Sequence, residues 1–331
     1  MNSLNNEEIQ EITVAILGVG NIGCRHLQSL MNTGFPINIY LYDIDLKRVE
    51  NVVKEIELNY NNKNVKVFVI DSLIHLPNKI FLCILATTAI SRLSTLIKVQ
   101  SNIRFLVLEK VLTSSLDELQ IYKNLTYKYE KVYVNMPYYF QDIFAQMFDL
   151  IINPKKVIFQ GNDYGIACNF VHFIDIAEKL LSKKIVISNK IESEILWKES
   201  SRKGFYDLTG KIELELSSGE IIDIFCGKEN KTDIQIKVLD NRNEFIYDWE
   251  TGDLSKNGFK VLNNQISFQS ERSIKILEDL LRNKEPQIAS LEKAIRIHEI
   301  LINVLQPSWN HYCEKNKNYN RGLTKNRMII T

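Results

Sequence analysis

The chain has 331 residues, of which 45% are hydrophobic and 24% are charged, so it is long enough to bury two separate cores. Its 41 basic and 40 acidic residues leave a formal net charge of +1, which gives no reason to expect nucleic acid or an anionic membrane as a partner. No apolar segment approaches the roughly 20 residues of a membrane-spanning helix, and the polar N-terminus does not resemble a secretory signal. The five cysteines are scattered and odd in number, which favours reduced thiols and a cytoplasmic location.

The first 135 residues alternate between strand-like and helix-like patterns. Short apolar runs predict strands at 13–17, 37–42, 65–70, 80–86, 104–108 and 131–135. Helical spacing predicts helices at 21–33, 45–58, 88–100 and 115–128. Strands separated by helices pair in parallel through right-handed crossovers. We therefore predict an α/β, doubly wound Rossmann domain over residues 1–135, with its ligand site beyond the carboxyl ends of the strands.

The first predicted strand runs directly into a glycine-rich turn that opens the first helix. Gly18, Gly20 and Gly23 form the pattern G-x-G-x-x-G in the strand–turn–helix context of a dinucleotide-binding fingerprint. Free N–H groups at the start of the helix, where Asn21 and Ile22 stand, would face a pyrophosphate, and the helix dipole would add to the attraction. We predict that these five residues bind a dinucleotide cofactor.

An acidic residue ends the second predicted strand. Asp43 follows Gly23 by 20 residues, where a carboxylate is placed to bond the ribose hydroxyls. Its charge would repel a 2′-phosphate, so we expect NAD rather than NADP. The alternative is that Asp43 only caps the next helix, a position for which Asp45 competes.

Two more strand ends carry residues of chemical interest. Ala86, Thr87 and Thr88 close the fourth strand, where small and hydroxyl side chains let a cofactor pass close by. Glu109 and Lys110 follow the fifth strand, and a lysine directly after a buried strand is in an unusual place. We predict that Ala86, Thr87, Thr88 and Glu109 bind the cofactor. The alternative for Lys110 is that it merely emerges into a loop.

Residues 136–331 are predicted as a second, α+β domain for substrate binding and oligomerisation. Helices are expected at about 140–152, 168–182, 270–282 and 288–305, strands at about 191–199, 212–216, 221–226, 233–239 and 244–249, and a polar, irregular tail from 308. The turn at Ser217-Ser218-Gly219 is typical of a hairpin, so the strands favour an open, mainly antiparallel sheet. One face of that sheet needs a cover, so we expect a homo-oligomer.

The helix predicted at 168–182 carries a polar row opposite its apolar stripe. Cys168, His172 and Asp175 are spaced i, i+4, i+7 and share one face, which would look into water or a cleft. By contrast, His298 falls in register with apolar residues and is expected to be a packed histidine, and His26 is likewise expected to be structural. A zinc site at Cys168 and His172 lacks two further ligands, so no metal is expected.

With these motifs, the chain resembles the glucose–fructose oxidoreductase/inositol dehydrogenase (Gfo/Idh/MocA) family over nearly its whole length. The resemblance rests on the glycine pattern followed by Arg25-His26, on Glu109-Lys110, and on the stretch from Gly161 to His172-x-x-Asp175. It implies an NAD(P)-dependent oxidoreductase that acts on a sugar, a sugar nucleotide or a cyclitol. It further implies Lys110 beside the nicotinamide and the substrate hydroxyl, His172 as the proton acceptor or as a residue that assists it, and Asp175 as a residue that binds or orients the substrate.

Two positions depart from the usual pattern of the family. Val111 stands where the family usually has proline, and Cys168 stands where many members have an acidic residue, so the row has one carboxylate fewer, with Asn169 as the nearest polar substitute. The leading hypothesis is a dehydrogenase of a small sugar-type substrate, in polysaccharide sugar metabolism. Two others stay open: transient use of NAD in epimerisation, elimination or glycoside hydrolysis, and a non-catalytic nucleotide-binding or regulatory protein.

Overall fold

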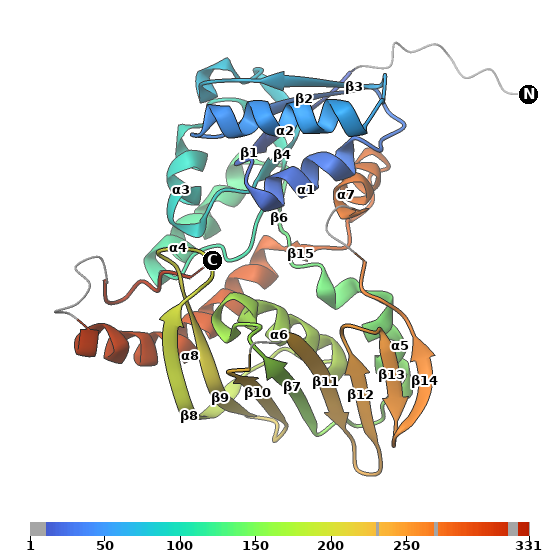
Figure 1. The fold of residues 1–331 in the computed structure, drawn as a ribbon, viewed down its shortest axis with the longest axis vertical. Coiled ribbons are helices and arrows are strands. Elements are labelled where there is room, and N and C mark those ends of the chain that lie inside the picture. The colour runs from blue at the N-terminus through green and yellow to red at the C-terminus, as the bar shows by residue number, and fades with distance from the viewer. Residues whose placement is uncertain (1–10, 230–231, 268–270, 317–323, 331) are drawn as a thin grey trace, which may run out of the picture. The chain divides into compact units, whose positions relative to one another are not determined.

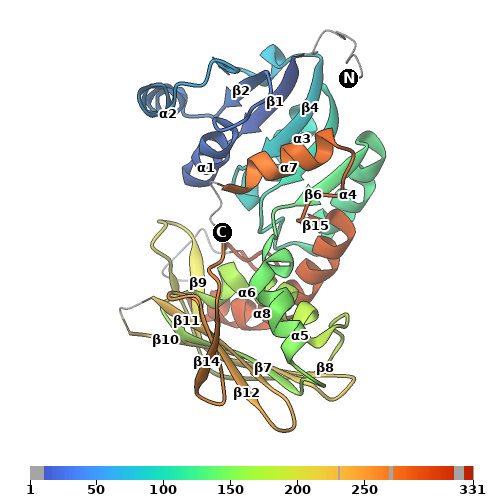
Figure 2. The same ribbon diagram turned by 90° about the vertical axis from the view of Figure 1, so that its right-hand side faces the viewer.

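The computed structural model describes residues 11–229, 232–267, 271–316 and 324–330. The chain forms two compact units (Figures 1 and 2). The first comprises Met1–Glu109, Tyr122–Asn135 and Phe268–Gln287, and the second comprises Lys110–Ile121, Met136–Ser267 and Ile288–Thr331. None of the helices in the described ranges combines the length and the apolar character that crossing a bilayer requires.

The first unit contains the predicted parallel sheet. Its strands are β1 (Ile12–Leu17), β2 (Ile37–Tyr42), β3 (Val65–Val69), β4 (Lys79–Leu85), β5 (Asn102–Leu108) and β6 (Lys131–Val134). They lie in the order β6-β5-β4-β1-β2-β3, and every neighbouring pair is parallel. The stretch 14–17 in β1 is fully buried, as expected of a strand that is covered on both faces. The predicted Rossmann fold is confirmed.

The helices that connect these strands also follow the prediction. They are α1 (Asn21–Leu30), α2 (Leu46–Asn59), α3 (Ala89–Lys98) and α4 (Leu116–Asn124), with short 3-10 turns η1 (Leu73–His75) and η2 (Leu125–Lys128). Each of the predicted helices is present, and each begins or ends within a few residues of its predicted boundaries.

The boundary between the two units does not fall simply at residue 135, because α7 (Arg272–Leu281) belongs to the first unit. Its apolar face, formed by Ile276, Leu277 and Leu280, is buried. The backbone N–H of Ile274 donates to the Ser29 hydroxyl of α1 at 3.0 Å. The segment Lys110–Ile121 lies instead with the second unit.

The second unit is built on an eight-stranded sheet in the order β14-β13-β12-β11-β7-β10-β9-β8. The strands are β7 (Lys156–Asn162), β8 (Ile187–Glu199), β9 (Tyr206–Leu216), β10 (Ile221–Gly227), β11 (Asp233–Leu239), β12 (Glu244–Asp248), β13 (Asp253–Lys256) and β14 (Phe259–Asn263). Only the β7–β10 pair is parallel among these neighbours, and β9 and β10 form the predicted hairpin. The mainly antiparallel sheet is therefore confirmed, whereas an oligomer that covers its outer face stays a prediction.

Three strands of this sheet, β7, β13 and β14, are not among the predicted ones. The end of β7 includes Gly161, the first residue of one stretch on which the family resemblance rests. A Cβ on this residue would lie 2.0 Å from the carbonyl oxygen of Asp233 on β11, so the glycine serves the close approach of two strands.

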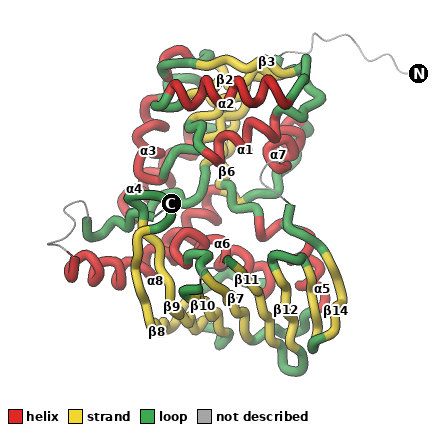
Figure 3. The backbone as a smooth tube through the Cα atoms, in the orientation of Figure 1, coloured by secondary structure: helices red, strands yellow, loops and turns green. Residues whose placement is uncertain are grey.

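The helices of this unit are α5 (Asp142–Leu150), α6 (Ile166–Leu181) and α8 (Leu291–Asn316), with the 3-10 turn η3 (Tyr138–Phe140) and the short strand β15 (Ala289–Ser290). Helix α6 packs against β7, β9, β10 and α8 (Figure 3). The prediction of an irregular tail from 308 is wrong as far as Asn316, because α8 continues through Pro307. Trp309 and Cys313 extend its buried face and explain why the helix does not end there.

Candidate functional site

The glycine turn after β1 is pressed against the end of β4. Gly18 has a φ of +95°, and its N–H donates to the carbonyl oxygen of Tyr42 at 2.7 Å. A Cβ at this position would lie 2.7 Å from the backbone nitrogen of Thr87 and 2.8 Å from the carbonyl carbon of Ala86. Only glycine fits both the backbone conformation and the space. The structure thus brings the predicted residues of the turn and of the β4 end together.

The other two glycines of the pattern have opposite surroundings. A Cβ on Gly23 would lie 2.0 Å from the carbonyl oxygen of Gly18, so the absence of a side chain lets α1 sit close to β1. A Cβ on Gly20, in contrast, would have no atom of the protein within 4 Å. Its φ of −76° is open to any residue, so neither conformation nor packing within the protein calls for glycine there. The open space at Gly20 fits a ligand that approaches the backbone.

The start of α1 is left without a side-chain cap. Gly20 is its N-cap residue and supplies no side-chain acceptor, while α2 has its cap in Asp45, which accepts from the N–H of Arg48 at 3.2 Å. The first N–H groups of a helix have no partner within the helix. The N–H groups of Asn21 and Ile22 are therefore placed to receive an anionic group, with the helix dipole in support.

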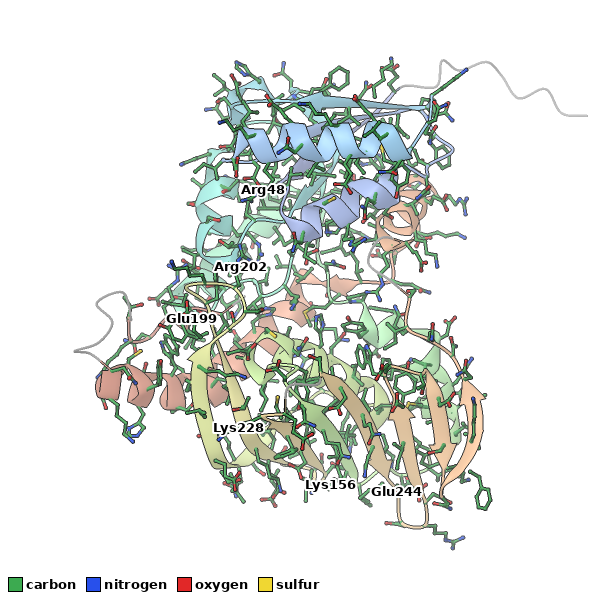
Figure 4. All side chains as sticks on the ribbon, in the orientation of Figure 1. Arg48, Lys156, Glu199, Arg202, Lys228 and Glu244 are labelled. Atoms are coloured by element: carbon green, nitrogen blue, oxygen red, sulfur yellow. The ribbon has the colours of Figure 1, made fainter. Side chains whose placement is uncertain are left out.

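Asp43 fastens this turn from the end of β2. Its Oδ2 accepts from the N–H of Val19 at 2.7 Å, and its Oδ1 accepts from the N–H of Asp45 at 3.0 Å. Arg48 belongs to the first turn of α2 and is labelled in Figure 4, and its guanidinium lies 3.9 Å from Oδ2 of Asp43. Asp45, and not Asp43, caps α2, so the alternative that Asp43 only caps this helix does not agree with its contacts. Its bond to a ribose stays a prediction.

The other predicted residues at the β4 end are engaged with α3. The carbonyl oxygen of Thr87 accepts from the guanidinium of Arg92 at 2.6 Å, and Arg92 itself is 2% exposed. Thr88 is the N-cap residue of α3, and its hydroxyl lies 3.0 Å from that of Ser91. These contacts hold residues 86–88, whose backbone packs against Gly18 of the glycine turn.

Glu109 lies inside the first unit, where it is the acceptor of a buried network. Its Oε1 accepts from Nε2 of His26 at 2.8 Å and from the amide of Asn135 at 2.5 Å, and Nδ1 of His26 lies 2.6 Å from the Ser273 hydroxyl on α7. Burial opposes the charge of Glu109, but these hydrogen bonds and the charge of Arg92 outweigh it and lower its pKa. His26 is fully buried, as expected of a structural histidine. The role of Glu109 as a cofactor-binding residue stays a prediction.

In the second unit, the Lys110 side chain reaches α6 one helical turn before His172. The Lys110 ammonium donates to the carbonyl oxygen of Cys168 at 3.0 Å, and Cys168 lies one helical turn before His172. The His172 ring packs edge-to-face on Tyr138, with the ring centroids 4.5 Å apart, and is 6% exposed. The peptide bond between Lys110 and Val111 is cis.

The expectation that the polar row of α6 looks into water or a cleft is wrong for Asp175. This carboxylate is fully buried, with Oδ1 2.5 Å from the ammonium of Lys293 on α8 and Oδ2 accepting from the N–H of Tyr139 at 3.2 Å. Burial raises the pKa of Asp175 to about 6, although Lys293 opposes the shift. Sequence spacing within α6 could not reveal Lys293, because it belongs to another helix.

Asp207 on β9 is a carboxylate of this region that sequence reasoning missed. Its Oδ1 accepts from the N–H of Ala167 at 2.7 Å, and burial raises its pKa. A Cβ on Gly165 would lie 2.2 Å from Oδ2 of Asp207, so the glycine makes room for this cap at the start of α6. Burial and the charge of Asp207 also raise the pKa of the Cys168 thiol. A carboxylate thus stands beside Cys168 after all, supplied by a strand rather than by the helix.

No group of three or more histidine, cysteine, aspartate or glutamate side chains in the described ranges is arranged to hold a metal ion.

No family model and no curated protein matches the chain in sequence. Solved structures do match in fold. A super-repressor mutant of Gal80p from Saccharomyces cerevisiae matches with a TM-score of 0.68 and 15% identity, over 89% of this chain and 95% of that one. UDP-N-acetylglucosamine 3-dehydrogenase from Acidithiobacillus ferrooxidans matches with a TM-score of 0.68 and 10% identity, over 89% and 96%. The chain has the Gfo/Idh/MocA-type fold.

A biliverdin reductase from Synechocystis, solved with biliverdin and NADP+, matches with a TM-score of 0.65 and 13% identity, over 89% of this chain and 98% of that one. The matched structures therefore include two named as a dehydrogenase and a reductase and one named as a repressor mutant. At these identities, the likeness shows the fold, and it confirms the suspected resemblance at that level.

The open space at Gly20 yields a prediction for cofactor binding. Gly20→Ala places a methyl group where no protein atom stands, so the melting temperature should stay within about 2 °C of the parent. The same methyl group should weaken NADH binding by about tenfold or more, because a tightly fitted ligand has to move away from it. Calorimetric titration with NADH measures the loss. Gly34→Ala, which also meets no neighbouring atom, is the control and should bind NADH like the parent; equal affinity in both variants would exclude a close approach at Gly20.

The burial of Asp175 yields a prediction for stability against pH. Its folded-state pKa of about 6 lies above the ordinary value of about 3.9, so its contribution to the free energy of unfolding is complete below pH 4 and is lost as the pH rises to 6. The loss should amount to roughly 2–3 kcal/mol. Asp175→Asn should lack this slope, so the advantage of the parent over the variant should shrink from pH 4 to pH 6 in urea unfolding. The exposed Asp149→Asn is the control, and a constant difference between parent and Asp175→Asn would contradict the assignment.

Proposed function

We propose that the protein is a nicotinamide-dinucleotide-dependent oxidoreductase that acts on a hydroxyl group of a sugar, a sugar nucleotide or a cyclitol. The observation that carries this proposal is the contrast within the glycine turn. Packing within the protein accounts for Gly18 and Gly23, whereas Gly20 borders open space at the uncapped start of α1. A pyrophosphate is the ligand that this arrangement fits best. The likeness in fold to a sugar-nucleotide dehydrogenase supports the same class of reaction.

The proposed cofactor contacts all come from the first unit. The N–H groups of Asn21 and Ile22 would hold the pyrophosphate, and the strand end at 86–88 would border the cofactor where it passes the turn. Asp43 keeps lone pairs beyond its two backbone bonds and is proposed to bond a ribose hydroxyl, which favours NAD over NADP.

The proposed chemistry on the substrate comes from the second unit. A bound nicotinamide supplies the hydride chemistry that side chains cannot perform. Lys110 is proposed to stabilise the alkoxide that develops when a hydroxyl is oxidised, because its ammonium keeps two N–H donors beyond the bond to Cys168. His172 is proposed to accept the proton, since an imidazole titrates near neutrality. Asp175 would act on the substrate indirectly, because its oxygens are bound to Lys293 and to the Tyr139 backbone.

An activity screen with a lysine variant tests this proposal. The parent, given NAD+ and an array of sugar nucleotides, sugars and cyclitols, should produce NADH absorbance with at least one of them. Lys110→Met should lower kcat by about a hundredfold, because the developing negative charge loses its cation, and should bind NADH as before. Lys184→Met, which changes an exposed lysine of the same unit, should keep full activity.

One other function has an observation in its favour. The closed Asp175–Lys293 pair and the likeness in fold to a Gal80p super-repressor mutant support a non-catalytic regulator that binds a nucleotide. If the chain is such a regulator, it should bind NADH and turn over none of the compounds in the array. Tight binding without turnover would therefore count against the oxidoreductase.

A further inference from the structure

The segment that follows Lys110 is buried although it has no regular secondary structure. Val111, Leu112, Thr113 and Ser114 are 1%, 0%, 1% and 4% exposed, respectively. Buried backbone groups outside helices and sheets need partners from elsewhere in the chain. The partners of this segment therefore decide where its backbone, and with it Lys110, is held.

His298 on α8 is one of these partners. Its Nε2 accepts a hydrogen bond from the N–H of Leu112 at 2.9 Å, and its Nδ1 lies 2.7 Å from the carbonyl oxygen of Ala294. A carbonyl can only accept, so Nδ1 carries the proton and Nε2 is free to act as the acceptor. The fully buried imidazole is thus held neutral in one tautomer, with its acceptor aimed at the backbone two residues after Lys110.

The other end of the same segment is held by α6, where the Lys110 ammonium donates to the carbonyl oxygen of Cys168 at 3.0 Å. One helix therefore binds the tip of the lysine side chain, and the other binds the backbone from which the side chain departs. The Ser114 hydroxyl adds a third anchor, because it donates to the carbonyl oxygen of Met328 at 2.5 Å.

Two ion pairs fix α6 and α8 to each other. Asp175 pairs with Lys293, and Glu178 pairs through both of its oxygens with Arg296. The partners are three residues apart on each helix, so the pairs form two successive rungs between the same faces. The helix that binds the Lys110 ammonium and the helix that binds the following backbone are therefore held at one spacing.

We propose that His298 is a positioning residue for Lys110. It fixes the backbone of the segment so that the ammonium of Lys110 stays at the α6 turn that carries His172. The expected effect of His298 on turnover rests on the proposed role of Lys110 in the oxidoreductase reaction. The expected effect of His298 on the position of the Lys110 side chain does not depend on that role. Packing by itself would require only an apolar side chain at 298, whereas positioning requires an acceptor at the place of Nε2.

Two substitutions at this residue separate these requirements. His298→Leu keeps apolar volume and removes the acceptor, which leaves the buried N–H of Leu112 without it. His298→Gln keeps an acceptor, since its amide oxygen reaches about as far as Nε2. Leu305→Ala is the control, because it damages the buried face of α8 two turns further on. If His298→Leu fails to fold, His298→Asn, which is one methylene shorter than glutamine, takes its place.

The first readout is the rate at which acetic anhydride labels Lys110 in the full-length protein, measured by mass spectrometry of its peptide. In His298→Leu, the labelling of Lys110 should accelerate about fivefold or more relative to that of Lys184, because losing a buried acceptor frees the segment. His298→Gln should restore the parent rate, and Leu305→Ala should lower the melting temperature without changing the relative rate. A parent-like rate in His298→Leu, or equal acceleration in Leu305→Ala, would overturn the proposal.

The second readout is turnover with a substrate found in the activity screen. His298→Leu should lower kcat about fivefold or more with KM unchanged, and His298→Gln should recover most of the loss. If the parent turns over no compound, the proposed oxidoreductase function fails, while the labelling rates still decide whether His298 positions Lys110.

Discussion

The close contact between Gly23 and the carbonyl oxygen of Gly18 is the constraint on which the first unit depends. A Cβ on residue 23 would lie only 2.0 Å from that oxygen, so any side chain there would collide with it. The absence of this side chain lets only three residues separate the end of β1 from the start of α1, with uncapped N–H groups beside open space at Gly20. The placement of the first N–H groups, to which we propose that a pyrophosphate binds, thus follows from packing, because the same contact that seats the helix also orients these groups.

Each unit also contains a buried carboxylate that holds neighbouring elements together. In the first unit, Glu109 joins the end of β5 to His26 of α1 and to Asn135 after β6. In the second unit, Asp175 joins α6 to Lys293 of α8 and to the η3 backbone. Buried charges are costly unless they are paired and hydrogen-bonded, so the contacts of these two residues are structural requirements of their units. Catalysis is therefore proposed for Lys110 and His172 more than for the carboxylates.

Local patterns sufficed to predict the parallel sheet and the glycine turn, because period, chain order and glycine spacing are properties of neighbouring residues. They failed where a contact between distant segments decides the outcome. Strand β7, which lies close to β11 at Gly161, is not among the predicted strands, and α8 passes through Pro307 because Trp309 and Cys313 are buried. Lys293, Asp207 and His298 acquire their roles only from partners more than 35 residues away in the chain. Periodicity identified His298 as a buried residue but could not show which backbone N–H it accepts from.

The most direct test of the central claim is a crystal structure of the protein grown with NADH. We predict that the pyrophosphate lies within hydrogen-bond distance of the N–H groups of Asn21 and Ile22, over the bare Cα of Gly20, with a ribose hydroxyl at Asp43. A dinucleotide bound elsewhere, or a glycine turn that stays empty at saturating NADH, would contradict the claim and reduce the turn to a device for packing α1 on β1.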